Sequence, residues 1–526
     1  MKRLTLILLL LTSSLALHAQ GEAGMMRNAE KIARALFYIQ QHYVDTVDID
    51  KAVDAMLKGL MDRLDPHSTY IPRDEVEATN EPLDGSFEGV GIEFTLMADT
   101  LVIQAVIGGG PAESVGLRAG DRIVAVDGEN VAGVGLTADG VRDRLRGPKG
   151  SKVTVNVLRN GELQDYVIRR DKIPLESVDA AYSPEPGIIY IKLSRFAMNS
   201  LQEFLDALKK YSDRRPDGMI IDLRGNGGGY MHIAVHLADI FLEKGQTIVR
   251  TEGNGIDQEE VASGRGFYPE GAVVLLVDEN SASASEILAG ALQDWDRAVI
   301  VGRRTFGKGL VQQQYPFNDG SQMRLTVARY HTPSGRVVQS PYEQGHRDEY
   351  YSHFRERYEH GESFSLDSIS LPDSLKFRTL KLGRTVYGGG GILPDVFVPY
   401  DTVGVNRYFR RVIGTGLLSE YAYDYADKHR KSLSADDFDG FLKKWQPLEE
   451  EAFDGLVAHC AEAGVTAGEG ELEACSQILH TRLKALMARS VLGTTGYWRV
   501  INMEEDPEFR RAMEIVRAWD GFPKDL

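Results

Sequence analysis

The sequence contains very little cysteine, because only Cys460 and Cys475 occur in 526 residues. Two thiols are too few for a disulfide scaffold, and no Cys/His spacing matches a zinc site. Neither cysteine lies near a site motif, which argues against a catalytic thiol. Export from the cell would permit a disulfide between them, and the loop that it closed would be short.

Basic residues are scarce relative to acidic ones, with 60 lysines and arginines against 77 aspartates and glutamates and a formal net charge of −17. A general nucleic-acid-binding protein needs a basic face that displaces the counterions of the phosphate backbone. We therefore expect no nucleic-acid partner.

Apolar residues make up 43% of the chain, which is typical of globular proteins. The length suggests three or four domains, at about 100–200 residues each.

Long hydrophobic runs are absent after the first 20 residues, MKRLTLILLLLTSSLALHAQ. This stretch has a basic start at Lys2 and Arg3, an apolar run, and small or polar residues up to Ala19, which is the pattern of a secretory signal peptide. The apolar run is shorter than the roughly 20 residues that a membrane-spanning helix needs. We therefore expect residues 1–19 to be a cleavable signal peptide and the protein to be periplasmic or otherwise exported. A retained anchor is the alternative.

Helical patterns occur towards both ends of the chain. In the region 20–84, apolar residues recur at steps of three and four, which predicts two helices over 28–64. The recurring positions are Ile32, Leu36, Ile39, Tyr43, Val53, Leu57, Leu60 and Leu64. Such a stripe packs either onto the body of the protein or onto a second subunit. Residues 401–526 also have helical periodicity, without a site motif. Both regions are candidates for forming a homodimer.

Residues 85–172 alternate short β-like runs with turn signals, among them GIEFTL, DRIVAVDG and KVTVNVLRNGE. The segment resembles a PDZ domain in its length and in the stretches EGVGIEF and GGPAESVGLRAGDRIVAVDG. Consecutive backbone N–H groups of its loop can form a nest for a terminal carboxylate, because glycine permits close approach. The loop residues are Gly89, Val90, Gly91 and Ile92. The resemblance implies that the C-terminal tail of a polypeptide adds as a strand beside GIEF.

Residues 173–400 have the pattern of an α/β core. Buried-type strands such as GMIIDLRG, AVVLLVDE and RAVIVG alternate with helical segments, which predicts parallel strands joined by crossover helices. Residues 341–376 are polar, charged and irregular, which predicts a surface insertion. The chain is thus predicted to be a multidomain α/β protein.

The stretch GRRTFGKG, Gly302–Gly309, fits the G-x-x-x-x-G-K part of a nucleotide-binding P-loop. A P-loop needs Ser or Thr next, to hold Mg²⁺, and a helix that receives the phosphates. Here Gly309 takes that position, and the following LVQQQYPF has an extended pattern. The sequence therefore argues against a nucleotide site, and Lys308 needs another role.

The stretch SASASEILAGALQD begins with three serines at alternate positions, Ser281, Ser283 and Ser285, where a buried strand is predicted to meet a helix. In open α/β sheets ligands bind at the carboxyl ends of strands, and the N–H groups of a helix N-terminus favour a developing oxyanion. Ser283 and Glu286 also fit the S-x-x-E capping box. This stretch alone leaves two interpretations open, a helix cap and a nucleophile.

A serine nucleophile needs a general base. His232, His236 and His331 have no recognisable triad spacing, although triads do not follow sequence order. A lysine can serve where desolvation lowers its pKa, and the surroundings of Lys308, TFGKGLV, are apolar and glycine-flanked. The glycines of DLRGNGGG, Asp222–Gly229, could present N–H groups to an anion or form only a tight turn.

Together, the motifs resemble the carboxyl-terminal processing proteases, also called tail-specific proteases. LDPHSTYIP, EGVGIEF, DLRGNGGG, NSASASEILAGALQD, GRRTFGKGLVQ and VYGGGGILPD occur in the order of that family and fall within residues 28–400. The resemblance implies a crotonase-like α/β protease core with a Ser–Lys dyad. Taken with the patterns above, the predicted domains are a signal peptide (1–19), an N-terminal helical region (20–84), a PDZ domain (85–172), a serine peptidase core (173–400) and a C-terminal helical domain (401–526).

The resemblance also assigns the residues of the site. Ser283 would be the nucleophile, Lys308 the general base, and Gln312 the residue that supports the lysine. The N–H groups of Ala284 and Gly229 would form the oxyanion hole. On a regular strand four residues span about 13 Å, so Lys308 and Gln312 can touch only if the chain turns or bulges between them. The other two serines of the motif would be structural: Ser281 and Ser285.

The sequence thus predicts a serine endopeptidase that recognises polypeptide substrates with free C-termini through its PDZ domain and cleaves them by way of an acyl-enzyme. No metal, nucleotide or other cofactor is expected. The alternative is a catalytically silent or partner-regulated PDZ scaffold protein of the cell envelope. The presence of Ser283, Lys308 and Gln312 argues against a silent core, whereas control by a regulatory partner protein fits the sequence equally well.

Overall fold

The computed structural model describes residues 24–97, 99–159, 161–211 and 215–522, so the predicted signal peptide lies outside the described residues. The chain divides into two compact units. The smaller comprises residues up to Val76, Gln313–Leu325 and Tyr342–Glu349, and the larger comprises Glu77–Gln312, Thr326–Pro341 and Tyr350–Leu526. None of the helices in the described part of the chain combines the length and the hydropathy of a membrane-spanning segment.

The smaller unit contains the N-terminal helices. Residues 24–42 are helical, and α2 follows at Ile49–Met61. The side chain of Asp48 caps α2 by accepting a hydrogen bond from the Lys51 N–H at 3.2 Å, which satisfies a backbone donor of the first turn. The prediction of two helices over 28–64 is confirmed.

The predicted PDZ segment forms a six-stranded antiparallel sheet with two helices. Its elements are β3 (Ile92–Met97), β4 (Thr100–Val106), α4 (Pro111–Ser114), β5 (Arg122–Val126), β6 (Glu129–Asn130), α5 (Ala138–Leu145), β7 (Lys152–Arg159) and β8 (Glu162–Arg169). The order β3-β4-β5-β7-β8 leaves β3 at an edge of the sheet. The two ends of the segment meet, because β2 (Ser86–Gly89) pairs antiparallel with β9 (Asp171–Pro174). The predicted β-rich domain therefore closes on itself.

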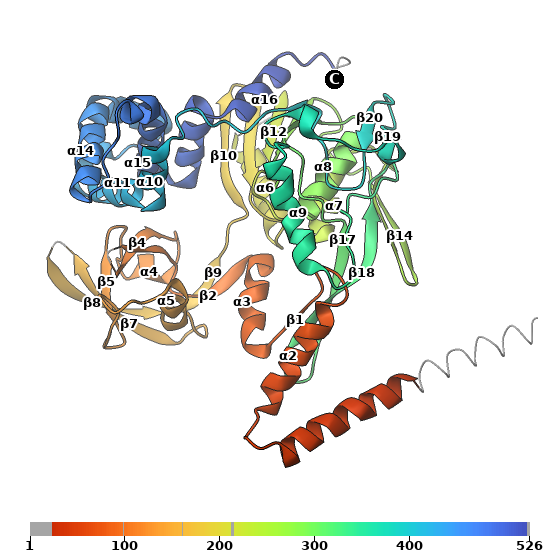
Figure 1. Ribbon diagram of the computed structural model, residues 1–526. Coiled ribbons are helices and arrows are strands. Elements are labelled where there is room, and N and C mark those ends of the chain that lie inside the picture. Colours follow the sequence, from red (N-terminus) through yellow and green to blue (C-terminus); the bar gives the residue numbers. More distant parts are fainter. Residues whose placement is uncertain (1–23, 98, 160, 212–214, 523–526) are drawn as a thin grey trace, which may run out of the picture. The chain divides into compact units, whose positions relative to one another are not determined.

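A second six-stranded sheet lies at the centre of the α/β core (Figure 1). Its strands in spatial order are β10 (Val178–Glu185), β11 (Ile188–Leu193), β12 (Gly218–Asp222), β15 (Ala272–Val277), β16 (Val299–Gly302) and β21 (Val396–Phe397). All neighbours from β11 to β21 are parallel, and β10 alone pairs antiparallel. Every residue of β11, β12, β15 and β16 is buried, as expected for parallel strands covered on both faces. The predicted crossover architecture is confirmed.

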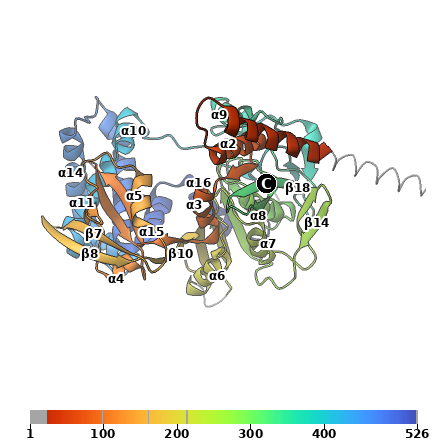
Figure 2. The ribbon, with the colours of Figure 1, turned by 90° about the horizontal axis from the view of Figure 1, so that it is seen from below.

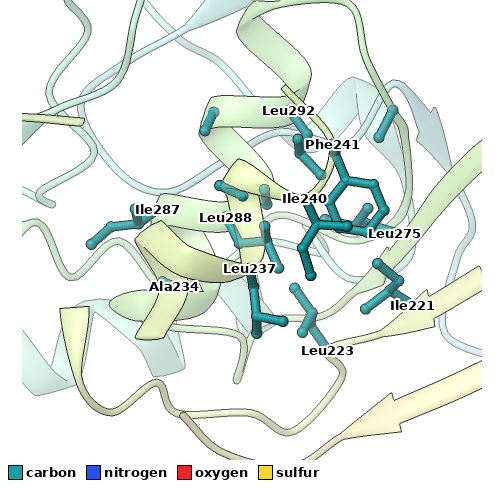
Figure 3. Packing of buried hydrophobic residues seen from close by; sticks show 14 of the residues in the cluster. Ile221, Leu223, Ala234, Leu237, Ile240, Phe241, Leu275, Ile287, Leu288 and Leu292 are labelled. Carbon is teal, nitrogen blue, oxygen red and sulfur yellow. The ribbon is translucent and has the colours of Figure 1, made fainter. Parts of the chain in front are cut away.

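Helices cover both faces of this sheet. They are α6 (Ser200–Tyr211), α7 (Met231–Asp239) and α8 (Ala284–Asp294) on one face and α16 (Pro507–Arg517) on the other. Because strand residues alternate between faces, Ile221 and Leu275 pack with α7 and α8 (Figure 3), whereas Ile220 and Val274 pack with α16. The last helix, which the sequence analysis grouped with the C-terminal helical domain, thus belongs to the core of the sheet.

A further sheet contributes residues beside the core. β18 (Gln322–His331) pairs through its first residues with β1 (Thr69–Ile71) in the smaller unit. In the larger unit its last residues pair with β13 (Thr247–Gly253), which in turn pairs with β14 (Ile256–Val261). β17 (Leu310–Pro316) also pairs with β18. This arrangement places Tyr330, near the end of β18, next to the chain that enters β17.

The C-terminal helices form their own cluster, grouped apart from α7 and α8 (Figure 2). They are α10 (Arg407–Gly414), α11 (Leu417–Lys428), α12 (Arg430–Leu433), α13 (Phe438–Trp445), α14 (Glu449–Glu462) and α15 (Glu471–Glu504). α15 is interrupted at Gly493, whose φ of 71° and ψ of −166° break the helix. Cys460 and Cys475 are buried in this cluster as free thiols, and burial raises the pKa of both.

The prediction of an irregular insertion at residues 341–376 is wrong in part, because α9 occupies Arg347–Glu359. The helix is fixed by aromatic and polar contacts rather than by an aliphatic stripe, so the hydrophobic pattern did not reveal it. The ring of Phe354 stacks on Phe306 with centroids 4.0 Å apart. The buried guanidinium of Arg357 donates to the carbonyls of Arg304 and Thr305, each at 3.2 Å. The insertion therefore supports the loop that precedes Lys308.

Candidate active site

Ser283 lies at the carboxyl edge of the core sheet, between β15 and α8. Its backbone has φ +57° and ψ −113°, a conformation that non-glycine residues rarely adopt. Such a residue costs on the order of 1–3 kcal/mol and persists only where its surroundings fix it. Ser283 is also the N-cap of α8, at the positive end of the helix dipole. The fold therefore holds this serine in a strained position that suits an anionic intermediate.

The two flanking serines are fully buried and make structural hydrogen bonds. The Ser281 hydroxyl donates to the carbonyl of Leu223 at 2.8 Å, and the Ser285 hydroxyl donates to the carbonyl of Asn226 at 2.9 Å. Both acceptors belong to the DLRGNGGG segment. The flanking serines thus fasten the serine loop to the glycine turn, and Ser283 is the one of the three that is partly exposed.

Glu286, the acidic residue of the predicted capping box, reaches further than α8. Its Oε2 accepts hydrogen bonds from the N–H groups of Ser283 at 2.8 Å and Lys308 at 2.9 Å. Its Oε1 accepts from the Thr305 hydroxyl at 2.6 Å and the Gly307 N–H at 2.7 Å. Burial raises the pKa of Glu286 to about 7. One buried carboxylate therefore fixes the backbones of both predicted catalytic residues.

The same contacts explain why the GRRTFGKG loop is not a nucleotide-binding P-loop. The N–H groups of Gly307 and Lys308, which a P-loop would present to a phosphate, bind the Glu286 carboxylate instead. The extended segment predicted after Gly309 is confirmed as β17, so no helix follows the loop.

Tyr330 makes a second bridge between the same two residues. Its hydroxyl lies 2.6 Å from the carbonyl oxygen of Lys308 and 3.2 Å from that of Ser283. The side chain is only 1% exposed, and burial raises its pKa well above the ordinary value, so the phenol remains a donor. Tyr330 and Glu286 thus hold the carbonyls and the amides, respectively, of Ser283 and Lys308.

The side chains of Lys308 and Gln312 meet, with Lys308 Nζ 3.2 Å from Gln312 Oε1. Lys308 lies in the loop ahead of β17, which begins at Leu310, so the separation of about 13 Å on a regular strand does not apply. The contact between the two side chains, which the sequence made conditional on a departure from a regular strand, is therefore present. The amide oxygen of Gln312 accepts from the amine and can orient it.

The glycine turn lies directly against the serine loop. Gly228 has φ +98°, and a methyl group added to it would lie 2.7 Å from the Ala282 carbonyl oxygen, 2.8 Å from Ser283 Cβ and 2.9 Å from Ala284 N. The Gly228 N–H itself donates to the side chain of Asn226 at 2.9 Å. Only glycine fits this approach.

The orientation of the next N–H follows from the peptide unit. The Gly228 carbonyl accepts from the Phe196 N–H at 2.9 Å. The Gly229 N–H belongs to the same planar unit and points the opposite way, away from Phe196. Ala284 is the first residue of α8, whose N–H groups have no partner within the helix. Neither the Gly229 N–H nor the Ala284 N–H is used by these contacts, and their role as oxyanion donors stays a prediction of the resemblance.

The histidines considered as alternative bases are engaged elsewhere. His331 Nε2 lies 3.5 Å from a carboxylate oxygen of Glu252. His232 and His236 are exposed on α7, with ring centroids 6.0 Å apart. These contacts leave Lys308 as the candidate base.

The PDZ segment carries a groove of about 390 Å³ between the edge strand β3 and helix α5. We call its apolar lining residues the floor and its charged lining residues, Glu93, Arg142 and Arg146, the rim. The lining residues are Phe87, Val90, Gly91, Ile92, Glu93, Phe94, Gln104, Ala138, Arg142, Leu145 and Arg146. An edge strand beside an apolar groove can accept a peptide as an added strand.

The predicted carboxylate loop closes one end of this groove. The carbonyl of Val90 accepts from the Ala112 N–H at 2.9 Å, and that of Gly91 accepts from the Ile107 N–H at 3.0 Å. The N–H groups of Gly91 and Ile92 therefore point the other way, because each shares a peptide plane with one of these carbonyls. These two N–H groups are the donors that the predicted loop, Gly89 to Ile92, would offer to a terminal carboxylate.

The sequence pattern indicates Glu286 only as a helix cap and does not indicate Tyr330 or Arg357. The S-x-x-E pattern signals the cap but not the contact with a loop more than 20 residues away. Tyr330 has no local signal at all, because its role arises from the pairing of β17 with β18. Among the described residues, no group of three or more His, Cys, Asp or Glu side chains could hold a metal ion.

Comparisons with known proteins identify the family. Residues 187–343 match the family described as Peptidase family S41, residues 102–159 match the PDZ domain, and residues 408–493 match a family of unknown function, DUF8443. The chain is 33% identical over 332 residues to the carboxy-terminal processing protease CtpB of Bacillus subtilis (strain 168), which covers 62% of this chain and 69% of CtpB.

Two further relatives are similar. A CtpA-like serine protease of Staphylococcus aureus (strain N315) is 35% identical over 323 residues, covering 61% of this chain and 63% of that protein. The solved photosystem II D1 C-terminal processing protease has 27% identity and a TM-score of 0.36, covering 72% of this chain and 89% of that one. The class of protein follows: it is a serine-type peptidase that carries a PDZ domain. The chain belongs to peptidase family S41, as a relative of the carboxy-terminal processing proteases, and the resemblance found in the sequence is confirmed.

Proposed function

We propose that the protein is an exported endopeptidase that binds polypeptides by their C-terminal tails and hydrolyses them with a Ser283–Lys308 dyad. The observation that carries the proposal is the convergence at one sheet edge of a strained serine, a glycine turn packed against it and a lysine loop tied to the same carboxylate as the serine. Family membership supports the peptidase activity.

In the first half of the reaction, Ser283 Oγ attacks the scissile carbonyl carbon while the neutral amine of Lys308 takes the hydroxyl proton. The contact with Gln312 keeps Nζ at one position. The N–H groups of Ala284 and Gly229 stabilise the oxyanion of the tetrahedral intermediate, helped by the N-terminus of α8. Lys308 then gives its proton to the leaving amine nitrogen, and an acyl-enzyme ester on Ser283 remains.

In the second half, Lys308 takes a proton from water, and the hydroxide attacks the ester carbon. The second tetrahedral intermediate collapses, the product acid leaves, and the proton returns to Ser283 Oγ. Each step uses only groups of this chain, the substrate and water. Ser283 acts as nucleophile, Lys308 as acid and base, and Gln312 as a positioning residue.

The PDZ groove supplies the recognition step of the proposal. A tail that adds beside β3 would place its terminal carboxylate at the N–H groups of Gly91 and Ile92. A test compares a reporter protein with a free C-terminal tail against the same reporter with its tail amidated. We expect the free tail to be cleaved at least tenfold faster at limiting substrate. Equal rates would contradict tail recognition, and tight binding without any cleavage would instead indicate a silent PDZ scaffold.

Export, dimer formation and partner control complete the proposal. The signal-peptide pattern of residues 1–19 supports export, and N-terminal sequencing of the secreted protein tests it. The helix at 24–42 exposes apolar side chains, with Ile32 at 43% and Phe37 at 55%, which supports a second copy as its partner. Light scattering should show a dimer for the full chain and a monomer for the Phe37→Asp variant.

A regulatory partner protein would change the cleavage rate when it is added.

A further inference from the structure

The three charged residues on the rim of the PDZ groove differ in the ion pairs that they already form. We propose that Arg142 makes the groove selective for tails that have an acidic side chain two residues before an apolar C-terminal residue. This inference rests on the proposed tail recognition and adds the class of tail.

The polarity of the groove fixes how a tail would lie. The carboxyl end of α5 is next to the carboxylate loop, because a methyl group added to Gly89 would lie 3.8 Å from the Cγ of Arg146. Leu145 is therefore beside the end of the tail, and Ala138, at the start of α5, is farther along it. A tail whose carboxylate binds this loop runs antiparallel to β3.

Spacing along the two elements identifies the tail residue that faces Arg142. Side chains of an extended tail alternate, so the last residue and the one two before it point to the same side, about 7 Å apart. Along α5 the rise of 1.5 Å per residue places Arg142 about 4.5 Å and Ala138 about 10 Å from Leu145. The side chain two residues before the end therefore falls between Arg142 and Ala138. The small Ala138 leaves room there for a longer side chain.

The apolar floor selects the last residue. Val90 is buried, and Ile92, Phe94, Leu145 and Phe87 line the same groove. An apolar terminal side chain buried there would be favoured by about 25 cal/mol per Å² of surface removed from water. A charged terminal side chain at the same place would lose hydration without gaining a partner from this floor.

Two of the three charged rim residues form ion pairs with residues of other elements. Arg146 pairs with Glu81 at 2.5 Å, and its guanidinium lies 5.1 Å from the centre of the Phe87 ring. The Glu81 side chain is only 9% exposed, so breaking this pair would leave a buried carboxylate without its partner. Glu93 is paired with Arg489 of α15. Each of these two charges therefore already faces an opposite charge from outside the groove.

Arg142 is different, because its partner is a neighbour on the same helix. It pairs with Asp139 at spacing i,i+3, and the two side chains are 49% and 84% exposed. Exposed pairs of this kind contribute only about 0.2–1 kcal/mol, so the guanidinium can change partners at little cost. A carboxylate on the tail, in a groove that excludes part of the water, is the stronger partner. A lysine at the same tail position would be repelled.

The test measures binding of labelled ten-residue peptides to the full chain with Ser283→Ala, which blocks cleavage. The peptides end in valine and differ only at the third residue from the end, which is Glu, Gln or Lys. We expect the Glu peptide to bind about fivefold more tightly than the Lys peptide, with Gln between them, and the difference to shrink in 0.5 M salt. Equal affinities of the three peptides would overturn the proposal.

Variants on the same helix make the test specific. Arg142→Glu should reverse the preference, and Arg142→Gln should abolish it. Arg144→Glu is the matched control, since Arg144 lies on α5 but outside the groove and pairs with Glu129. It should leave the ranking unchanged. A preference that survives Arg142→Gln, or that Arg144→Glu also reverses, would contradict the assignment. An amidated peptide that binds as tightly as the free one would instead contradict tail recognition itself.

Discussion

Ser283 and Lys308 are joined through their backbones by two buried side chains. Glu286 accepts hydrogen bonds from both N–H groups, and the Tyr330 hydroxyl lies within 3.2 Å of both carbonyl oxygens. Both bridges act on the main chain. Ser283 Oγ and Lys308 Nζ, the proposed nucleophile and base, therefore depend for their positions on two residues that need not touch the substrate.

Tyr330→Phe removes one bridge and preserves the ring. We expect kcat to fall about tenfold, because loosening the two loops misplaces the nucleophile and the base. KM and tail affinity should change little. The matched control is Tyr268→Phe, which removes another buried hydroxyl, bonded at 2.9 Å to the Pro216 carbonyl far along the chain. Steady-state kinetics measure kcat and KM of both variants. If Tyr330→Phe loses as much stability as Tyr268→Phe but keeps its kcat, the Tyr330 hydroxyl contributes only to stability.

Glu286→Gln tests the buried carboxylate through its pH dependence. Burial raises the pKa of Glu286 from 4.5 to about 7, so the folded state binds this proton more tightly than the unfolded state. The contribution of this bound proton to the free energy of unfolding is fully present below about pH 4.5 and is lost as pH rises through about 7. The glutamine variant cannot titrate. Its stability relative to the natural protein should therefore rise between pH 5 and pH 8, by up to about 3 kcal/mol.

Thermal or denaturant unfolding of both proteins at several pH values measures this difference. A difference that stays flat from pH 5 to pH 8 would mean that the carboxylate is ionised throughout the range.

The glycine turn offers a graded series of alanine variants. Gly228→Ala places a methyl group within 3 Å of three atoms of the serine loop, so we expect severe loss of activity and of stability. Gly225→Ala meets no atom within 4 Å but keeps φ +75°, which should cost about 1 kcal/mol. Gly227→Ala has neither problem and should behave like the natural protein. Cleavage rates and melting temperatures that fail to follow this order would contradict the close approach of the turn.

The helical segment matched to a family of unknown function, 408–493, contacts the PDZ domain. Arg430 donates to the Ala119 carbonyl at 2.8 Å, and a Cβ added at Gly120 would lie 3.7 Å from the Cβ of Asp427. That separation suits a disulfide. We expect Gly120→Cys with Asp427→Cys to form a bridge under mild oxidation, although φ +90° at position 120 adds strain.

A matched control pairs Asp427→Cys with Gly116→Cys, whose added Cβ would meet no atom within 4 Å. Mass spectrometry of the oxidised proteins reports the bridge. Equal bridging in both pairs, or none in either, would mean that the PDZ domain does not rest on these helices in solution.

Much of the fold could be predicted from the sequence because its signals are local. The runs GMIIDLRG and AVVLLVDE are uniformly apolar, and both form fully buried strands. α9 could not be predicted, since its position depends on Phe354 stacking on Phe306 and on buried Arg357, contacts between distant segments. The same holds for the end of the chain, where α16 packs on the core sheet rather than with the preceding helices.

Some residues of the candidate site could likewise be predicted from local motifs, and others could not. Ser283, Lys308 and Gln312 lie in recognisable motifs, and the contact between Lys308 and Gln312 follows from the loop that precedes β17. The assignment of Gly229 and Ala284 as oxyanion donors stays a prediction. Tyr330 became visible only through strand pairing, because no spacing rule connects it to either residue that it bridges.

The most direct test of the account is the specificity constant of Ser283→Ala on a substrate with a free tail. If Ser283 is the nucleophile, kcat/KM should fall by about 10⁴-fold or more, while the affinity for the tail and the melting temperature stay close to those of the natural protein. A Ser283→Ala protein that cleaves within tenfold of the natural rate would contradict the account.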